Sequence, residues 1–344
     1  MIDSYQNKKA MLIGNGLNLL DSSQSFSWGG LLEEIKSDYG ISVDLDNIFK
    51  PFPLTFDEMQ HTKLGGNSLK EKLKTLKKAI RRNIENQLTG KDGFNDYHKK
   101  IAQLDYDDIL TTNYDYSLEK SISSNFITLK KKYAQNNQER KYSLKRCYKI
   151  NSKTKFWHIH GELFDSRKHS LDSKSYAEES IMIGYEHYAE YLEKIQENIK
   201  GKSGTQRTDN QSLTIRIKNS KESPFWTDIF FTHNLDIIGQ AIDFSENHLW
   251  WIFNYRANLI KEGNSKNGVR INNTIRFFYP ILRNGQMIDI LALRDINDLI
   301  KKRNSVQKSK AIAEVLQAFQ VIPISIECDS YTDFYDQLIS NYLN

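Results

Sequence analysis

The strongest constraint on the fold is an alternation between short apolar runs and longer segments with helical periodicity. The apolar runs, each bounded by turn residues, predict strands at 10–13, 108–111, 156–160, 180–183, 235–238, 274–279 and 319–326. Between the first two strands, Leu69, Leu73, Leu76, Ile80 and Ile84 recur every three or four residues, which predicts an amphipathic helix. This order favours an α/β fold with a Rossmann-like, mostly parallel sheet covered by helices on both faces.

The spacing of the predicted strands indicates one domain with interruptions. We predict a single Rossmann-type domain over residues 1–344 with a helical insertion at 28–103, because that gap exceeds what one crossover needs. Residues 189–225 include a Gly-, Ser- and Lys-rich stretch and predict a polar, flexible insertion. Residues 256–344 form a predicted C-terminal extension of strands and helices.

Composition narrows the class of protein. Apolar residues make up 39% of the 344 residues, enough for a substantial core, and the net charge is only +5. Cys147 and Cys328 are too few and too far apart for a disulfide framework or a thiolate zinc site. We expect a cytoplasmic protein without a signal peptide or a membrane span. Its lysine-rich stretches fit solvated helix faces, so nucleic acid is not the expected direct partner.

A glycine-bracketed turn follows the first predicted strand. Gly14, Asn15 and Gly16 would let the backbone approach a ligand phosphate, because glycine has no Cβ and tolerates positive φ. The dinucleotide fingerprint needs a third glycine where Leu19 stands. Phosphate binding and a simple tight exit from the strand therefore both remain open.

The second predicted strand ends in the segment TTNYDYSLE. Asn113 would lie at the carboxyl edge of the sheet, where ligands usually bind, with a helix beginning near Tyr114. Asn113 is also a good residue to cap that helix, and Asp115 in its first turn would complement the helix dipole. From the residues alone, capping and catalysis are equally good interpretations of Asn113.

The third predicted strand ends in FWHIHGE. His158 and His160 would share one face of the strand, but no carboxylate and histidine nearby in sequence complete a set of metal ligands, so we expect no metal site. His160, beside Gly161, is the better placed of the two for general base catalysis. A structural histidine is the alternative.

A similar layout recurs at LDIIGQAIDFSENHLWWIF. Gly239 follows the strand, and a helix with Trp250 and Trp251 comes after it. Asp243 could cap that helix or meet a ribose hydroxyl, and the sequence favours the cap slightly.

The ordered set IGNGLN, TTNYD, HIHGE and IIGQAIDFSENHLWWIF resembles the sirtuin-like NAD-cleaving domains of bacterial anti-phage defence, and also the AbiH abortive-infection family. The resemblance spans roughly residues 10–255. It places the glycine loop at Gly14, Asn15, Gly16 and Asn18, and the catalytic His-Gly pair at His160 and Gly161. It also equates residues 112–115 with the sirtuin Gln-Asn-x-Asp segment.

The resemblance implies an NAD+ hydrolase that releases nicotinamide and ADP-ribose. Asn113 would position water or the ribose, His160 would accept a proton, and Asp115 would either stabilise the cationic ribose or order its loop. The implied NAD-binding residues are Gly14, Asn15, Gly16, Asn18, Gly239, Gln240 and Asp243. No cofactor beyond the substrate NAD+ is expected, and no zinc.

The same resemblance implies a role and partners. Depletion of NAD by an effector of abortive infection would need control by a separate partner, such as an ATPase or a sensor protein, and a homo-oligomer is expected. Protein deacylation is not expected, because the four-cysteine zinc module of sirtuin deacylases is missing. The alternative is a non-catalytic subunit of a defence complex that senses NAD or a nucleotide.

Overall fold

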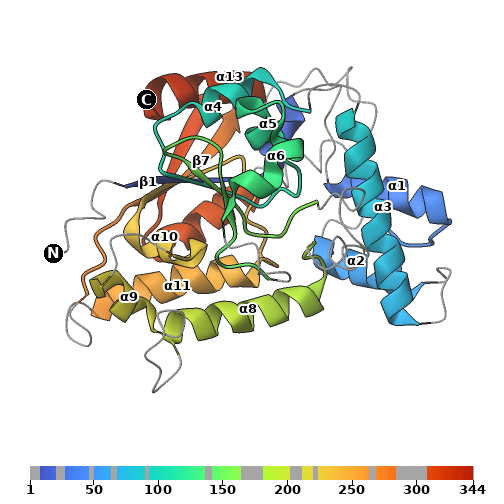
Figure 1. The fold of residues 1–344 in the computed structure, drawn as a ribbon, viewed down its shortest axis with the longest axis horizontal. Helices are drawn as coiled ribbons and strands as arrows, with labels where there is room; N and C mark the ends of the chain where they lie inside the picture. Colours follow the sequence, from blue (N-terminus) through green and yellow to red (C-terminus); the bar gives the residue numbers. More distant parts are fainter. Residues whose placement is uncertain are drawn as a thin grey trace.

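The computed structural model of the chain describes most of its residues, arranged as helices around one mixed sheet (Figure 1). The described ranges are 8–20, 28–45, 50–62, 68–89, 93–135, 142–163, 181–201, 211–219, 224–262, 269–283 and 308–343. Within these ranges, eight strands form a single sheet in the order β3-β4-β5-β2-β1-β6-β7-β8.

Six of these strands are parallel. Their bounds are β1 (Lys9–Ile13), β2 (Asp108–Thr111), β5 (Lys155–His158), β6 (Asn234–Ile238), β7 (Ile275–Leu282) and β8 (Ile322–Cys328). The short strands β3 (Ala134–Gln135) and β4 (Cys147–Lys149) extend one edge in antiparallel pairing. The predicted Rossmann-like, mostly parallel α/β fold is therefore confirmed.

Strand β1 lies at the centre and pairs with β2 on one side and β6 on the other. Its side chains alternate between two hydrophobic cores, because successive residues of a strand point to opposite faces. Met11 and Ile13 enter one core, and Ala10 and Leu12 enter the other. Both faces of the sheet are thus apolar, as a sheet covered on two sides requires.

Helices cover both faces. The bounds of those that contribute to the first core are α1 (Trp28–Tyr39), α2 (Phe52–His61), α3 (Leu69–Thr89), α4 (Asp96–Ala102), α5 (Ser117–Ile122), α6 (Phe126–Tyr133) and α13 (Tyr331–Leu338). The second core is covered by α8 (Tyr185–Lys200), α9 (Leu213–Asn219), α10 (Trp226–Thr232), α11 (Asn247–Glu262) and the helical residues 308–318. A 3-10 helix, η1 (Asn15–Leu20), follows β1, and a π-helical turn, η6 (Ile339–Leu343), follows α13.

The interruptions in the strand order are largely helical. The predicted insertion at 28–103 holds α1 to α4, and α3 carries the predicted apolar stripe, with Leu76, Ile80 and Ile84 buried. We expected a polar, flexible segment at 189–225. The described residues of this range form most of α8, then α9, and residues 224–225, which precede α10. Helix α8 buries Tyr191, Ile195 and Ile199 in the core. Residues 202–210 and 220–223 lie outside the described residues.

The extension at 256–344 continues the same sheet through β7 and β8. Several predicted strand boundaries were wrong. Strand β5 ends at His158, although the Ile159 backbone N–H still donates to the Thr111 carbonyl of β2 at 2.9 Å. Strand β7 continues to Leu282, and β8 runs from Ile322 to Cys328. Residues 181–183 form no strand, although the Met182 backbone N–H donates to the His160 carbonyl at 3.0 Å.

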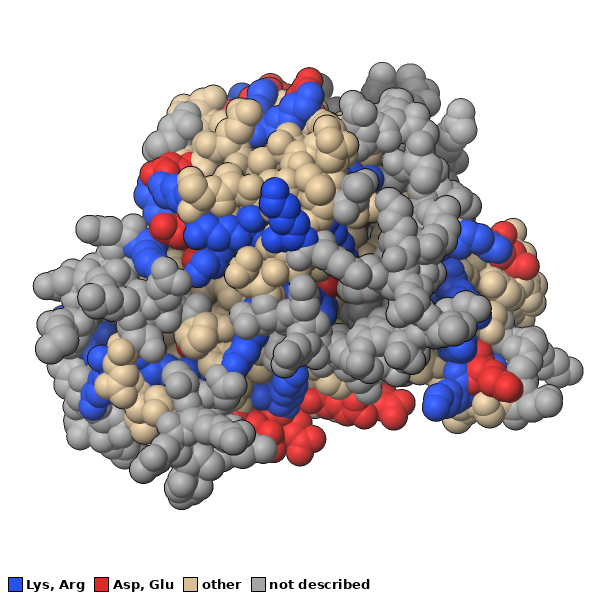
Figure 2. All heavy atoms as spheres, viewed as in Figure 1, with Lys and Arg blue, Asp and Glu red and all other residues tan. Residues whose placement is uncertain are grey.

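Charge on the molecule is mixed. Figure 2 shows mainly lysines and arginines across the centre of the described part of one face, and acidic side chains mainly at its edges, among them the edge where α8 lies in Figure 1. Helix α8 carries Glu186, Glu190, Glu193 and Glu197. Among the described helices, none combines the length and apolar character that a membrane span needs.

Candidate functional site

A pocket of about 470 Å³ opens at the carboxyl ends of the parallel strands. The strands that carry the pocket are the central strands of the sheet. The strand order changes direction at β1, with β2 and β5 on one side and β6 on the other, and open α/β sheets bind ligands at such a point. Each strand supplies lining residues just after it ends: Gly16 after β1, Thr112 and Tyr114 after β2, His160 after β5, and Gly239 after β6. The pocket is therefore the candidate site.

The glycines let two strand exits pack against each other. The Gly16 backbone N–H donates to the Gly239 carbonyl at 2.9 Å, and a Cβ on Gly16 would lie 2.9 Å from the Gly239 Cα. A Cβ on Gly14 would overlap the Gln240 side chain. Gly239 has a φ of 57° and needs glycine for that reason as well. Gly16 and Gly239 line the pocket, whereas Gly14 serves the contact between the two loops.

Asn18 links the loop after β1 to the loop after β2. Its amide nitrogen donates to the Asp115 carboxylate at 3.0 Å and to the Asn15 side chain at 2.9 Å. Its amide oxygen lies 2.9 Å from Nε2 of His98, a buried residue of α4. Burial lowers the pKa of His98 to about 4, so the imidazole is neutral at pH 7. The helical insertion thus fixes the orientation of Asn18.

Asp115 lies behind the pocket wall. One carboxylate oxygen accepts from Asn18 and the other from the Ser117 backbone N–H at 2.9 Å, at the start of α5. These contacts correspond to the loop-ordering role that the sequence left open beside a role at the ribose.

Asn113 also lies behind the wall, between Thr112 and Tyr114. Its side-chain amide donates to the Gly14 carbonyl at 3.2 Å and ties the exit of β2 to the exit of β1. Helix α5 begins at Ser117 with Tyr116 at the N-cap position, so the interpretation of Asn113 as the helix cap was wrong. The chain turns for three more residues before the helix starts.

The two histidines of HIHGE separate because β5 ends between them. His158 is buried with its Nε2 2.7 Å from Glu119, whereas His160 reaches the pocket. Gly161 follows at a φ of 90°, which explains the glycine in this turn. His158 and His160 therefore do not form a chelating pair.

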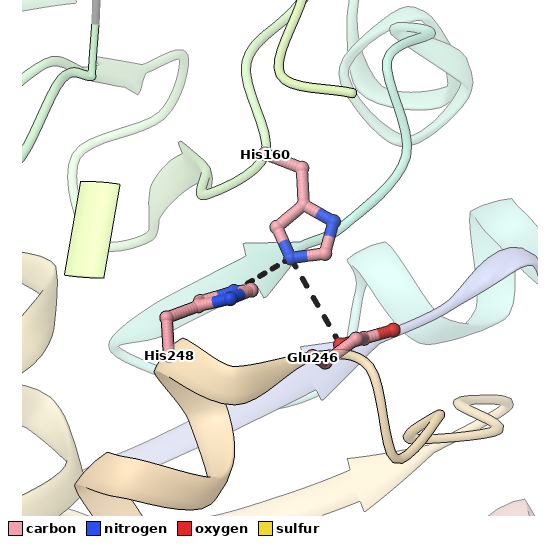
Figure 3. Close-up of side chains that lie close together, drawn as sticks. All are labelled: His160, Glu246 and His248. Carbon is pink, nitrogen blue, oxygen red and sulfur yellow. Dashed lines mark hydrogen bonds and ion pairs between the residues drawn. The ribbon is translucent and has the colours of Figure 1, made fainter. Parts of the chain in front are cut away.

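His160 meets two residues that our sequence analysis did not single out. Its Nε2 lies 2.8 Å from Nε2 of His248 and 3.9 Å from a carboxylate oxygen of Glu246 (Figure 3). Burial lowers the pKa of His160 to about 3, and burial together with the nearby His160 lowers that of His248 well below its usual value. Both imidazoles are therefore neutral at pH 7.

Glu246 lines the pocket beside His160. Burial and the neighbouring Asp243 raise its pKa to about 8, and the Gln240 amide donates to its two oxygens at 3.2 and 3.3 Å. Gln240 is held in turn by the Thr112 hydroxyl at 2.9 Å. The signal that could have found Glu246 and His248 was available: SENH comes a few residues after the predicted strand 235–238 and Gly239, and TTNYD and HIHGE likewise lie at the ends of predicted strands.

Asp243 lines the pocket without capping a helix. Its carboxylate accepts from the Ser245 backbone N–H and hydroxyl at 2.9 and 2.7 Å, and it pairs with Lys308. Helix α11 begins at Asn247, so the slightly favoured interpretation of Asp243 as its cap was wrong.

The C-terminal extension closes the pocket with aromatic side chains. Phe278 and Tyr279 of β7 and Phe334 and Tyr335 of α13 line it. The Tyr335 hydroxyl is buried against Gly239 and has no hydrogen-bond partner among the described residues. This aromatic wall was not predicted from the sequence.

One comparison with known protein families bears on the segment at the centre of this pocket. Residues 107–215 match a family model described as SIR2-like domain. The matched segment runs from β2 into α9 and contains Asn113, Asp115 and His160, which supports a sirtuin-like family and an NAD-related function. No curated protein matches the chain.

Proposed function

We propose that the protein is an NAD+ glycohydrolase whose reaction takes place in the pocket at the ends of β1, β2, β5 and β6. The observation that carries the proposal is the position of His160, which lies within the SIR2-like match and lines the pocket together with the glycines of two loops. Its imidazole is neutral at pH 7, the form that a general base needs, although burial lowers its pKa to about 3 and so makes it a weak base.

The pocket has the parts that an NAD+ molecule requires. Its volume of about 470 Å³ falls in the range of small-molecule and cofactor sites. Gly16 and Gly239 of two loops line it, and Phe278, Phe334 and Tyr335 offer aromatic faces on which a ring can stack. We assign the pyrophosphate to the loop after β1, with Asn15 beside it, and the adenosine side to Gly239 and Asp243, whose carboxylate can accept from a ribose hydroxyl.

The chemical step makes modest demands. Nicotinamide leaves as a neutral molecule from a cationic pyridinium, so the enzyme has to support the positive charge left on the ribose. In the proposed reaction a water oxygen bonds to C1′ while the electron pair of the C1′–N bond passes to nicotinamide. His160 accepts the proton of that water, and the Glu246 carboxylate, when ionised, stabilises the cationic ribose.

Asn113 acts in this scheme through the loops. Its hydrogen bond to the Gly14 carbonyl sets the distance between the exits of β1 and β2, which carry Gly16 and Thr112 into the pocket. Water attack yields ADP-ribose, and attack by an adenine nitrogen would yield cyclic ADP-ribose.

We further propose that the reaction serves anti-phage defence by depleting NAD, under the control of a separate partner and within a homo-oligomer. This step rests on the resemblance of the motif set to sirtuin-like defence effectors.

Nicotinamide release from NAD+ by the purified chain tests the proposal, with and without the proteins encoded beside it. His160→Ala should abolish release and Asn113→Ala should reduce it strongly, whereas His187→Gln, a change at a buried histidine of α8 outside the pocket, should leave it intact. NAD+ binding without release by the wild type, alone and with its neighbours, would support the sensor alternative. If the wild type neither binds NAD+ nor releases nicotinamide, both functions are refuted.

A further inference from the structure

The side chains of His160, Glu246 and His248 form a cluster of possible metal ligands. His160 comes from the turn after β5, Glu246 immediately precedes α11 and His248 lies in the first turn of α11, so only the fold brings them together. One ligand atom from each lies within 4.8 Å of the other two. Figure 3 shows the His248 ring and the Glu246 carboxylate on the same side of the His160 imidazole.

We propose that His160, His248 and Glu246 bind one divalent transition-metal ion of the Zn2+ class. Two imidazole nitrogens and one carboxylate oxygen are a ligand set that zinc uses where a further coordination position stays open. Ligand atoms about 2.0–2.2 Å from such an ion stand about 3.4 Å apart at a tetrahedral angle. The separations of 2.8 Å and 3.9 Å from Nε2 of His160 bracket that value, so small side-chain rotations place the three atoms around one ion.

The chemistry of the two imidazoles suits a cation. An imidazole offers a lone pair at Nε2 once its proton resides on Nδ1. Without an ion, two Nε2 atoms 2.8 Å apart require a proton on one of them. The Glu246 side chain is 14% exposed, accepts from the Gln240 amide and has a carboxylate oxygen 3.9 Å from Nε2 of His160, so that oxygen is within reach of an ion there.

The surroundings supply support and access. Gln240 orients the Glu246 carboxylate, and Thr112 orients Gln240, which is the outer arrangement that metal sites use to hold their ligands. His160 and Glu246 line the pocket, so the open coordination position faces the space where the substrate binds.

Metal binding would act against NAD cleavage, an effect that rests on the proposed function. The ion would occupy the nitrogen with which His160 accepts a proton, and a dication beside the ribose would repel the positive charge of the transition state. The site would therefore inhibit the reaction while filled.

Titration of the chelator-treated full chain with ZnCl2, followed by calorimetry, tests the site without any NAD. We expect one equivalent to bind, and the affinity to fall at least about 100-fold in both His248→Gln and Glu246→Gln, because each removes a ligand. His187→Gln is the matched control and should bind as the wild type does. Glu246→Gln keeps the size of its side chain, so it reports on the site even if His248→Gln fails to fold.

Co2+ provides a second readout. Its visible ligand-field bands should appear at one equivalent without a sulfur charge-transfer band, because no cysteine belongs to the cluster. Absence of a bound equivalent in the wild type, or unchanged affinity in Glu246→Gln, would overturn the site; two neutral histidines joined by a hydrogen bond would then describe it.

Nicotinamide release then separates the two proposals. Metal-free wild type, alone or with the proteins encoded beside it, should release nicotinamide, and one equivalent of Zn2+ should slow release at least about 100-fold. Zn2+ binding to a chain that releases no nicotinamide when metal-free, both alone and with those proteins, would refute the NAD hydrolase and leave the metal site standing. Release that persists at full rate with Zn2+ bound would overturn the inhibitory effect.

Discussion

Replacement of Gly239 by alanine tests whether the pocket depends on close packing between the loop after β6 and α13. Gly239 has a φ of 57°, where a residue with a Cβ costs about 1–2 kcal/mol. The new Cβ would also overlap the hydroxyl of Tyr335, which is 1% exposed and cannot move aside without disturbing the core. Such overpacking adds about 1–3 kcal/mol, so we expect Gly239→Ala to lower the free energy of unfolding by about 2–5 kcal/mol.

Gly40 is the matched control for the backbone part of this cost. It follows α1 with a φ of 59°, and a Cβ placed there meets no atom within 4 Å. Gly40→Ala should therefore cost only about 1–2 kcal/mol. Urea unfolding followed by circular dichroism measures both variants.

The second half of the experiment removes the hydroxyl. Tyr335→Phe alone should cost little, because that hydroxyl has no partner among the described residues, and combined with Gly239→Ala it should recover about 1–3 kcal/mol. Equal losses for Gly239→Ala and Gly40→Ala, or no recovery in the double variant, would refute the packing argument.

Two further predictions concern buried charge. Arg146→Met should lower the free energy of unfolding by about 3–5 kcal/mol, because it removes the guanidinium that lies 2.6 Å from the fully buried carboxylate of Glu162. Arg82→Met, which removes an exposed pair with Asp38, should cost less than about 1 kcal/mol. Equal losses in urea unfolding would contradict this prediction. Burial lowers the pKa of His98 from 6.5 to about 4, so below pH 6.5 the unfolded chain binds a proton there that the folded chain does not, and the free energy of unfolding should fall by about 3 kcal/mol as pH drops from 6.5 to 4. His98→Gln should reduce the slope of the unfolding free energy against pH by about one proton. Parallel slopes for wild type and variant would show that the buried imidazole is not the cause.

The fold was largely predictable because strand and helix patterns are local. Apolar runs such as 10–13 and 108–111 are buried on both faces of a parallel sheet, so their side chains carry the signal along the whole strand. The edge strands β3 and β4 were missed because they are two and three residues long, too short for any period to show. The boundary of β5 was misplaced because Ile159 is apolar and fully buried although it lies in a turn.

The site was predictable only in part. Strands that end in glycine pointed to the correct edge of the sheet, and His160 and Gly239 line the pocket there. The direction of each side chain was not encoded locally: Asn113 turns to the Gly14 carbonyl and His158 to Glu119, away from the ligand space. Which neighbour a side chain meets depends on loops that are distant in sequence.

By itself the sequence determined the class of fold, the central strands and the edge of the sheet that carries the pocket, because periodicity and glycine turns act over a few residues. Tertiary structure alone decided that His160 meets His248 and Glu246, across 88 and 86 positions of the chain, and that the C-terminal extension walls the pocket. The physical reason is that the order of parallel strands in the sheet, which no local pattern encodes, determines which strand exits become neighbours.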